Sequence, residues 1–439
     1  MKEKGNVSGL ALEGLRIIDL SMWFAGPMAT RLLADMGAEV IKIESVRRFD
    51  PWRGPVVLTP RLEETYPADM PKDRPYNCSP GFNLQNRNKY GITLDLQRSR
   101  GKEIFKSLVK ISDIVVENYS PRVMSNFGLD YPVLKDINPR VIMMSMPGMG
   151  RTGPDRDFVA FGQTIDCLSG MAYLTGYRGE EPMLQSGLSY GDPLSGMNAA
   201  FAILSALHYR RRTGEGMHVE LSQVEGLVAF QAEAIMDYTM NGRIRERMGN
   251  RHPSMAPQGC YRCHGEDEWV VITIPSDDAW RNLCQAMGRT DLVADERFST
   301  STGRLQLQDE LDSLIEAWTL KLGSCEIMRI LQNVGIPAGP VLDAKGLMED
   351  PHFEARGIFE EVTHPDAGTR PYVGMYAKFS KTPGSIRRPA PCFGEHNQYI
   401  LGNLLGLSQE AIAELEKEGV IGSRPSPEQP GGIHSASRK

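Results

Sequence analysis

The 439-residue sequence predicts an α/β protein with a Rossmann-like parallel-sheet domain and a second, smaller α+β domain. Two patterns predict this fold class. Over roughly the first 150 residues, short apolar runs alternate with stretches of helical periodicity, which is typical of a parallel sheet covered by helices on both faces. Between about residues 255 and 345 the pattern changes to a hairpin followed by amphipathic helices. The length also exceeds what one core normally holds, which favours two or three domains.

The first strand–helix–strand unit is predicted within residues 15–44. Residues 15–20 form a short apolar run, the expected first strand. Pro27 stands in the first turn of the following helix, where a missing N–H is tolerated, and Gly37 stands where a helix C-cap is expected. Residues 39–44 are expected to form the next strand.

The alternation continues beyond a long connecting segment. Strands are expected at residues 92–96, 114–116 and 141–146, and a helix at residues 101–111. Right-handed crossovers between such strands give a Rossmann-like sheet. Residues 46–88 carry several prolines and arginines, and we expect them to form a long functional loop.

The rest of the chain predicts helices and one hairpin. Two helices are expected, a mostly buried one at residues 194–209 and another near residues 225–240. Residues 261–263 and 269–272 are predicted to pair as a hairpin, and Ser276 to cap the helix that follows. Residues 423–439 are rich in Pro, Gly and Ser and are expected to form a disordered tail.

Composition and charge narrow the classes of function. The net charge of −6 does not indicate a nucleic-acid partner. We find neither a signal-peptide pattern nor an apolar run of about 18 residues, so a cytoplasmic protein without a membrane span is expected. The seven cysteines are dispersed along the chain, which is typical of reduced thiols in a cytosol.

Three short motifs suggest functions that their context weakens. Residues 148–153 spell GxGxxG, but proline and charged residues follow in place of a helix, so a plain loop is favoured over a dinucleotide site. Residues 187–191 spell GxSxG without a preceding strand, and a serine hydrolase at Ser189 stays open as an alternative. Cys260 and Cys263 lack the partners that zinc or haem attachment needs, and no metal site is expected.

Asp192 precedes Pro193 at the expected start of the helix over residues 194–209. The simplest interpretation is an ordinary helix start, with Asp192 as N-cap and Pro193 as the first helical residue. A carboxylate at this position is also kept ionised by the helix dipole, so a chemical role for Asp192 is compatible with the structural one.

Several short segments together identify a protein family by their order and spacing, although none of them is specific for a family by itself. The segments are residues 15–20, 25–27, 32–44, 86–89, 94–96, 116–119, 191–192 and 195–197. In this arrangement the chain resembles, from Leu12 to about Leu405, the family III CoA-transferases (CaiB/BaiF type). This family includes formyl-CoA, carnitine and benzylsuccinate CoA-transferases and their racemase relatives.

The resemblance implies roles for individual residues. The family's nucleophilic aspartate falls on Asp192. Its coenzyme A contacts fall on or near a set of residues in the first third of the chain: Phe24, Ala25, Arg47, Leu94, Gln97, Asn118, Tyr119 and Ser120.

The sequence also departs from the family pattern. Ser45 stands where the family often has an arginine, and Arg47 or Arg48 is expected to replace it. Asn126 stands where the formyl-CoA branch has a basic residue, and the glycine-rich loop of that branch is missing near residues 249–259. Details of nucleotide and substrate binding therefore stay open.

The implied activity is transfer of coenzyme A from an acyl-CoA, with succinyl-CoA as a candidate donor, to a carboxylic acid acceptor. The implied intermediates are an aspartyl anhydride and an aspartyl-CoA thioester, and no tightly bound cofactor is expected. Phe161 stands where racemase relatives have a catalytic histidine, which argues against the alternative of an acyl-CoA racemase or isomerase.

The resemblance further implies an interlocked homodimer, or an assembly with a homologous second subunit. The large domain would then be discontinuous, with residues 1–225 and 350–422 enclosing a small domain of residues 226–349, ahead of the tail at 423–439. No nucleic-acid or membrane partner is expected.

Overall fold

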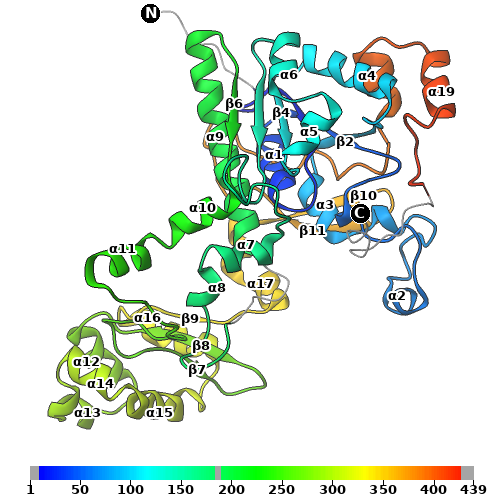
Figure 1. Ribbon diagram of the computed structural model, residues 1–439. Coiled ribbons are helices and arrows are strands. Elements are labelled where there is room, and N and C mark those ends of the chain that lie inside the picture. Colours follow the sequence, from blue (N-terminus) through cyan, green and yellow to red (C-terminus); the bar gives the residue numbers. More distant parts are fainter. Residues whose placement is uncertain (1–8, 183–188, 427–439) are drawn as a thin grey trace, which may run out of the picture. The chain divides into compact units, whose positions relative to one another are not determined.

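The computed structural model describes residues 9–182 and 189–426, which divide into two compact units. The large unit contains residues 9–171, 189–236 and 356–426, and the small unit contains residues 172–182 and 237–355. Along the chain, the small unit therefore lies between parts of the large one (Figure 1).

The large unit is built on a six-stranded sheet in which all neighbouring strands are parallel. Its strands are β1 (Arg16–Asp19), β2 (Glu39–Glu44), β3 (Lys89–Thr93), β4 (Ile114–Glu117), β5 (Ile142–Ser145) and β6 (Met217–Glu220). They lie in the order β3-β2-β1-β4-β5-β6, so the order reverses between β1 and β4. This is the strand order of a doubly wound Rossmann sheet, and it confirms the predicted fold class.

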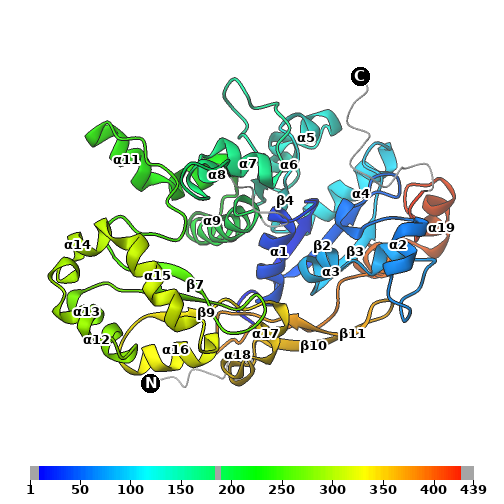
Figure 2. The same ribbon diagram turned by 90° about the horizontal axis from the view of Figure 1, so that it is seen from below.

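Helices cover both faces of the sheet because adjacent strand residues point to opposite sides. Ile17 packs into a core with α1 (Ala25–Asp35) and α9 (Gly191–Thr213). Ile18 packs into the opposite core, to which α4 (Ser99–Lys110), α6 (Tyr131–Ile137) and α19 (Gln409–Lys417) contribute (Figure 2). Every residue of α1 is buried, with α9 packed against it.

The connections of the large unit differ from the prediction in two places. Residues 46–88 are not a structureless loop, because they contain η1 (Pro51–Arg53), α2 (Pro60–Thr65), η2 (Pro75–Asn77) and α3 (Pro80–Asn86). Each of these elements begins with a proline, a residue suited to the first helical position. The strand predicted at residues 92–96 lies at Lys89–Thr93 instead. It begins with a buried lysine, whose charge is compensated by Asp19 at 2.9 Å.

The helix predicted at residues 194–209 is confirmed as α9, but the prediction that it is mostly buried is wrong. One side of α9 exposes large apolar residues, namely Met197, Phe201, Leu204 and Tyr209. The helical region near residues 225–240 consists of α10 (Gln223–Phe230) and α11 (Ala232–Asn241). The remaining elements of the large unit are α5 (Arg122–Phe127), α7 (Gly162–Leu168), β10 (Phe359–His364), β11 (Gly368–Val373) and η4 (Tyr399–Leu404), and α8 (Met171–Leu174) leads into the small unit.

The small unit has its own core around a three-stranded antiparallel sheet. Its strands are β7 (Gln258–Arg262), β8 (Trp269–Thr273) and β9 (Ala338–Pro340), so the predicted hairpin is confirmed. Ser276 accepts a hydrogen bond from the Ala279 N–H at 3.2 Å and caps α12 (Asp277–Ala286), as predicted. The other helical elements are α13 (Asp291–Ala294), η3 (Glu296–Phe298), α14 (Ser301–Gln306), α15 (Gln308–Thr319), α16 (Ser324–Asn333), α17 (Ala344–Glu349) and α18 (Pro351–Arg356).

Other predictions concern the cysteines and the ends of the chain. Cys260 and Cys263 are free thiols at the hairpin, and the described residues contain no cluster suited to a metal ion. Within the same residues, no helix is long and apolar enough to cross a membrane. Most of the tail expected at residues 423–439 lies outside the described residues, but the Ser426 N–H donates to the Val46 carbonyl at 2.8 Å.

Candidate active site at the carboxyl edge of the sheet

A pocket of about 1030 Å³ lies in the large unit where four neighbouring strands end. Its walls include residues that directly follow β1, β2, β3 and β4, which meet at the point where the strand order reverses. Open α/β sheets bind their ligands at this point. The volume is at the upper end of the range for ligand sites, so the pocket has room for a ligand as large as a nucleotide.

The pocket brings together the residues that the sequence marks for coenzyme A. Seven of the eight predicted contact residues line it: Phe24, Arg47, Leu94, Gln97, Asn118, Tyr119 and Ser120. Ala25 is buried behind the wall as the first residue of α1. Ser45 and Arg48 line the pocket as well, whereas Asn126 lies outside its lining. The contacts with coenzyme A themselves stay predictions.

Asp192 lines the same pocket at the meeting point of two helices. It is the second residue of α9, which begins at Gly191, so the prediction that Asp192 is the N-cap is wrong and its side chain is free of the capping role. Its carboxylate accepts a hydrogen bond from the backbone N–H of Ala25, at the start of α1. The positive ends of two helix dipoles therefore act on one carboxylate.

The surroundings of Asp192 raise its pKa to about 6 from an ordinary value of 3.8. Burial is the largest cause, and the negative charge of Asp166 adds to it, while the hydrogen bond from Ala25 opposes both. Asp166 is itself buried and accepts a hydrogen bond from the Gly191 N–H at 3.1 Å. The Asp192 carboxylate is thus ionised at neutral pH but more basic than an exposed aspartate.

Because Gly162 has no side chain, the Asp192 carboxylate can lie directly against its backbone. A Cβ atom on Gly162 would fall inside the contact distance of Asp192 Oδ2 and only 2.6 Å from Ser189 Oγ. The backbone at Gly162 therefore approaches the carboxylate as only glycine permits. Neither Gly162 nor Asp166 was predicted as a site residue, because a single sequence gives no signal for such proximity.

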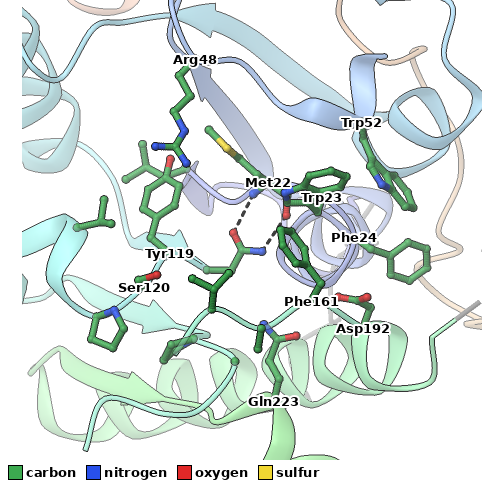
Figure 3. A pocket seen from close by; sticks show the side chains of 18 of the residues that line it. Met22, Trp23, Phe24, Arg48, Trp52, Tyr119, Ser120, Phe161, Asp192 and Gln223 are labelled. Carbon is green, nitrogen blue, oxygen red and sulfur yellow. Dashed lines mark hydrogen bonds between the residues drawn. The ribbon is translucent and has the colours of Figure 1, made fainter. Parts of the chain in front are cut away.

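A rigid turn after β1 forms the centre of the pocket. Trp23 has a φ of +64°, a left-handed conformation that is rare for a bulky residue. The Met22 N–H donates to Asn118 Oδ1 and the Met22 carbonyl accepts from Asn118 Nδ2, both at 2.8 Å (Figure 3). The Trp23 N–H donates to Asp50 at 3.0 Å, and Asp50 pairs with the fully buried Lys42 at 3.0 Å. These bonds hold the strained turn, and strain of this kind concentrates at functional sites.

Aromatic rings line the side of the pocket that holds Asp192 (Figure 3). Trp23 and Phe161 make an edge contact with ring centres 5.6 Å apart, and Phe24 and Trp52 make another at 5.1 Å. Phe161 directly precedes Gly162, so it stands beside the carboxylate. No histidine is among the described residues that line the pocket, which leaves Asp192 without the imidazole base that a racemase would need.

The two glycine motifs do not form the sites that their letters suggest. Residues 148–153 form a loop that no helix follows directly, so the prediction of a plain loop is confirmed. Gly187 and Leu188 of the GxSxG motif lie outside the described residues. The Ser189 hydroxyl is buried without a hydrogen-bond partner in the described part of the chain, so it lacks the base that a hydrolase serine requires.

The strand order and the pocket at its reversal define the chain as a doubly wound α/β protein with a pocket at the carboxyl edge of its sheet. Comparison with known proteins specifies the class further. Residues 12–397 match the family model described as CoA-transferase family III, and the chain belongs to this family. It is accordingly a CoA-transferase.

Relatives and solved structures match over nearly their full lengths. The chain is 36% identical to succinyl-CoA–D-citramalate CoA-transferase of Chloroflexus aurantiacus, over 93% of this chain and 98% of the relative. It is 32% identical to the alpha subunit of succinyl-CoA–L-malate CoA-transferase of the same organism, over 94% and 93%. A CaiB/BaiF family protein from Brucella suis superposes with a TM-score of 0.76 at 29% identity, covering 90% of this chain and all of that one.

Proposed function

We propose that this enzyme moves coenzyme A from an acyl-CoA donor to a carboxylic acid acceptor, with Asp192 as the nucleophile. The observation that carries this proposal is the Asp192 carboxylate, which lies in the pocket with a pKa raised to about 6. A carboxylate of this kind attacks a thioester without a general base, since it is already ionised at neutral pH.

The reaction proceeds through four acyl transfers at one carboxylate. Asp192 attacks the donor thioester carbonyl, forming a mixed anhydride and releasing the CoA thiolate. The thiolate attacks the aspartyl carbonyl of the anhydride, which expels the donor acid and leaves an aspartyl-CoA thioester. The acceptor carboxylate attacks this thioester, forming a second anhydride and releasing the thiolate again. The thiolate then attacks the acceptor acyl carbon, which yields the new acyl-CoA and free Asp192.

The chain's own groups support each step. The N–H of Ala25 already donates to the Asp192 carboxylate and can stabilise negative charge that develops on its oxygens. Thioester energy is kept throughout, so the scheme requires neither ATP nor a metal ion. Trp23 and Phe161 line the pocket, and an acyl group that covers these rings would exclude water, which would otherwise hydrolyse the anhydrides.

Coenzyme A would extend from Asp192 along the ends of the strands. The exposed Arg47 and Arg48 follow β2 and offer guanidinium groups to phosphates, and Arg47 lies 4.0 Å from Asp95. Asn118, Tyr119 and Ser120, which follow β4, line the pocket, and Tyr119 and Ser120 lie on the same side as Arg48 (Figure 3). Succinyl-CoA is a candidate donor, because relatives are named for its use.

Assembly into a homodimer, or with a homologous second subunit, is part of the proposal. The apolar side chains that α9 exposes, among them Phe201 at 72% exposure, would be covered by a second chain. A relative's name includes an alpha subunit, which supports testing both kinds of assembly.

A cytoplasmic location fits a soluble substrate such as coenzyme A and the seven free cysteines.

The transfer reaction itself tests the proposal. Asp192→Asn is expected to lower transfer from succinyl-CoA to an acid acceptor by about a thousandfold or more, because an amide does not replace the nucleophile. Binding of coenzyme A, measured by calorimetry, should persist. Asp136→Asn, at an exposed aspartate of α6 outside the pocket, is the matched control. Transfer at wild-type rate by Asp192→Asn would contradict the assignment.

A further inference from the structure

Aromatic rings line the part of the pocket beside Asp192, where the acyl group of a substrate would lie (Figure 3). Four aromatic side chains, those of Trp23, Phe24, Trp52 and Phe161, line the pocket in two edge-to-face pairs. Figure 3 shows them on the side of the pocket that holds Asp192. Phe161 is still 50% exposed, so its ring has an open face that a ligand can cover. Rings in such a wall gain most from an apolar or aromatic partner.

Two polar side chains of the pocket, those of Gln223 and Ser189, have unpartnered oxygens among the described residues. Gln223 lines the pocket, and its Nε2 is committed to the Met146 carbonyl at 2.8 Å. Gln223 Oε1 is buried without a partner among the described residues, so it offers an acceptor, which repels a second carboxylate. The unpartnered hydroxyl of Ser189, next to the Gly162–Asp192 contact, can donate to the oxygen of the reacting carboxyl group.

The cationic side chains that line the pocket are few and exposed. Among the described residues that line the pocket, the only cationic side chains are Arg47, Arg48 and Arg156. Arg48 lies on the opposite side of the pocket with Tyr119 (Figure 3), and Arg47 follows the same strand. Arg156 is exposed and lies 3.5 Å from Asp157, which already balances its charge. A second carboxylate on the acyl chain would therefore lose its hydration without gaining a buried cation.

We propose that the acyl subsite beside Asp192 selects monocarboxylic acids with a bulky apolar or aromatic substituent over short dicarboxylic acids. This inference rests on the proposed function and goes further by naming the substrate class. The substituent covers the open face of Phe161 and the rings behind it, while the carboxyl group meets Asp192 and the Ser189 hydroxyl. Succinyl-CoA would occupy the same subsite as a less favoured acyl donor.

A competition experiment tests the selectivity. The full-length enzyme receives limiting succinyl-CoA and equal concentrations of 3-phenylpropanoate and glutarate, and mass spectrometry gives the ratio of the two CoA products. The ratio reports the two acceptors alone, because both compete for the same donor. We expect 3-phenylpropanoyl-CoA to exceed glutaryl-CoA by about tenfold or more, from burial of the phenyl ring.

Variants connect the ratio to the wall. Phe161→Ala is expected to lower the ratio by about tenfold, since it removes the open ring face. Phe161→Arg is expected to reverse the preference, because it adds a cation for the second carboxylate. Phe379→Ala, at an exposed phenylalanine of the large unit outside the pocket, should leave the ratio unchanged. An excess of glutaryl-CoA with the wild type, or a ratio unaffected by Phe161→Ala, overturns the proposed selectivity while leaving the transferase reaction intact.

If the proposed transferase function is wrong, neither CoA product forms with the wild type or with any variant. The selectivity of the acyl subsite is then tested by the binding of the two free acids. Trp23 and Trp52 are two of the five tryptophans and report acid binding through their fluorescence. Binding of 3-phenylpropanoate about tenfold tighter than that of glutarate, lost in Phe161→Ala, supports the subsite. Equal binding of the two acids overturns it.

Discussion

Replacement of Asp192 by asparagine should stabilise the fold at neutral pH although it removes the proposed nucleophile. In the folded chain the pKa of Asp192 is raised from 3.8 to about 6, chiefly by burial and secondly by Asp166. The folded state therefore binds this proton more tightly than the unfolded state does. The stability that the protonated group contributes is fully present below about pH 3.8 and is lost as the pH rises through about 6.

The magnitude follows from the two pKa values. The difference between 3.8 and about 6 corresponds to about 3 kcal/mol at about 1.4 kcal/mol per pH unit. Because the side chain is half-buried, solvent lowers this to about 2 kcal/mol. Asparagine keeps the shape and an oxygen for the Ala25 N–H, but it carries no charge to desolvate. Asp192→Asn should thus match the wild type near pH 4 and exceed its free energy of unfolding by about 2 kcal/mol at pH 7.

Urea unfolding of both proteins at equal concentration, from about pH 4 to about pH 8, measures this difference. Asp136→Asn serves as the control, because Asp136 is exposed. A variant less stable than the wild type at pH 7, or a difference that does not change with pH, would refute the reasoning. Either result would mean that the Asp192 carboxylate is better solvated, or better paired, than its contacts imply.

Three further predictions concern the same site. The kcat/KM of transfer should fall about tenfold per pH unit below about pH 6, because only the ionised Asp192 carboxylate attacks. Asp166→Asn should shift this fall to lower pH, because it removes the negative charge that raises the pKa of Asp192. A pH profile that Asp166→Asn leaves unchanged would contradict this effect of Asp166. Gly162→Ala should lower kcat by about a hundredfold by displacing the nucleophile, and the control Gly339→Ala, whose Cβ meets open space, should not. Asn118→Ala should raise the KM for acyl-CoA about tenfold, because it frees the turn after β1; an unchanged KM would show that Asn118 does not hold the pocket.

The sequence predicts the central fold well because the strands of the large unit are buried on both faces. Such strands appear as apolar runs, as at β4 and β5. The prediction fails at β3, where Lys89 is buried by pairing with Asp19, and at β6, whose residues are only partly buried. The exposed apolar side of α9 has the same composition as a buried helix, so hydrophobicity alone does not reveal it.

Some residues of the candidate site are predictable from the sequence, and others are found only in the structure. Asp192 and the coenzyme A contacts are predicted because the family pattern preserves their spacing, and the pocket brings nearly all of them together. Gly162, Asp166 and Trp52 are distant from Asp192 along the chain, and only the fold shows their proximity to Asp192 or to the pocket rings. In the sequence, Phe161 is notable only because it stands where racemase relatives have a histidine, whereas in the structure its ring is part of the pocket wall.

Trapping of the covalent intermediate tests the central claim most directly. The protein is incubated with succinyl-CoA, quenched with hydroxylamine and digested, and its peptides are mapped by mass. We predict a hydroxamate on Asp192, formed from the aspartyl anhydride or the aspartyl-CoA thioester. An unmodified Asp192, in a protein that binds coenzyme A and transfers it to an acid, would contradict the account, because the reaction would then proceed without a covalent aspartyl intermediate.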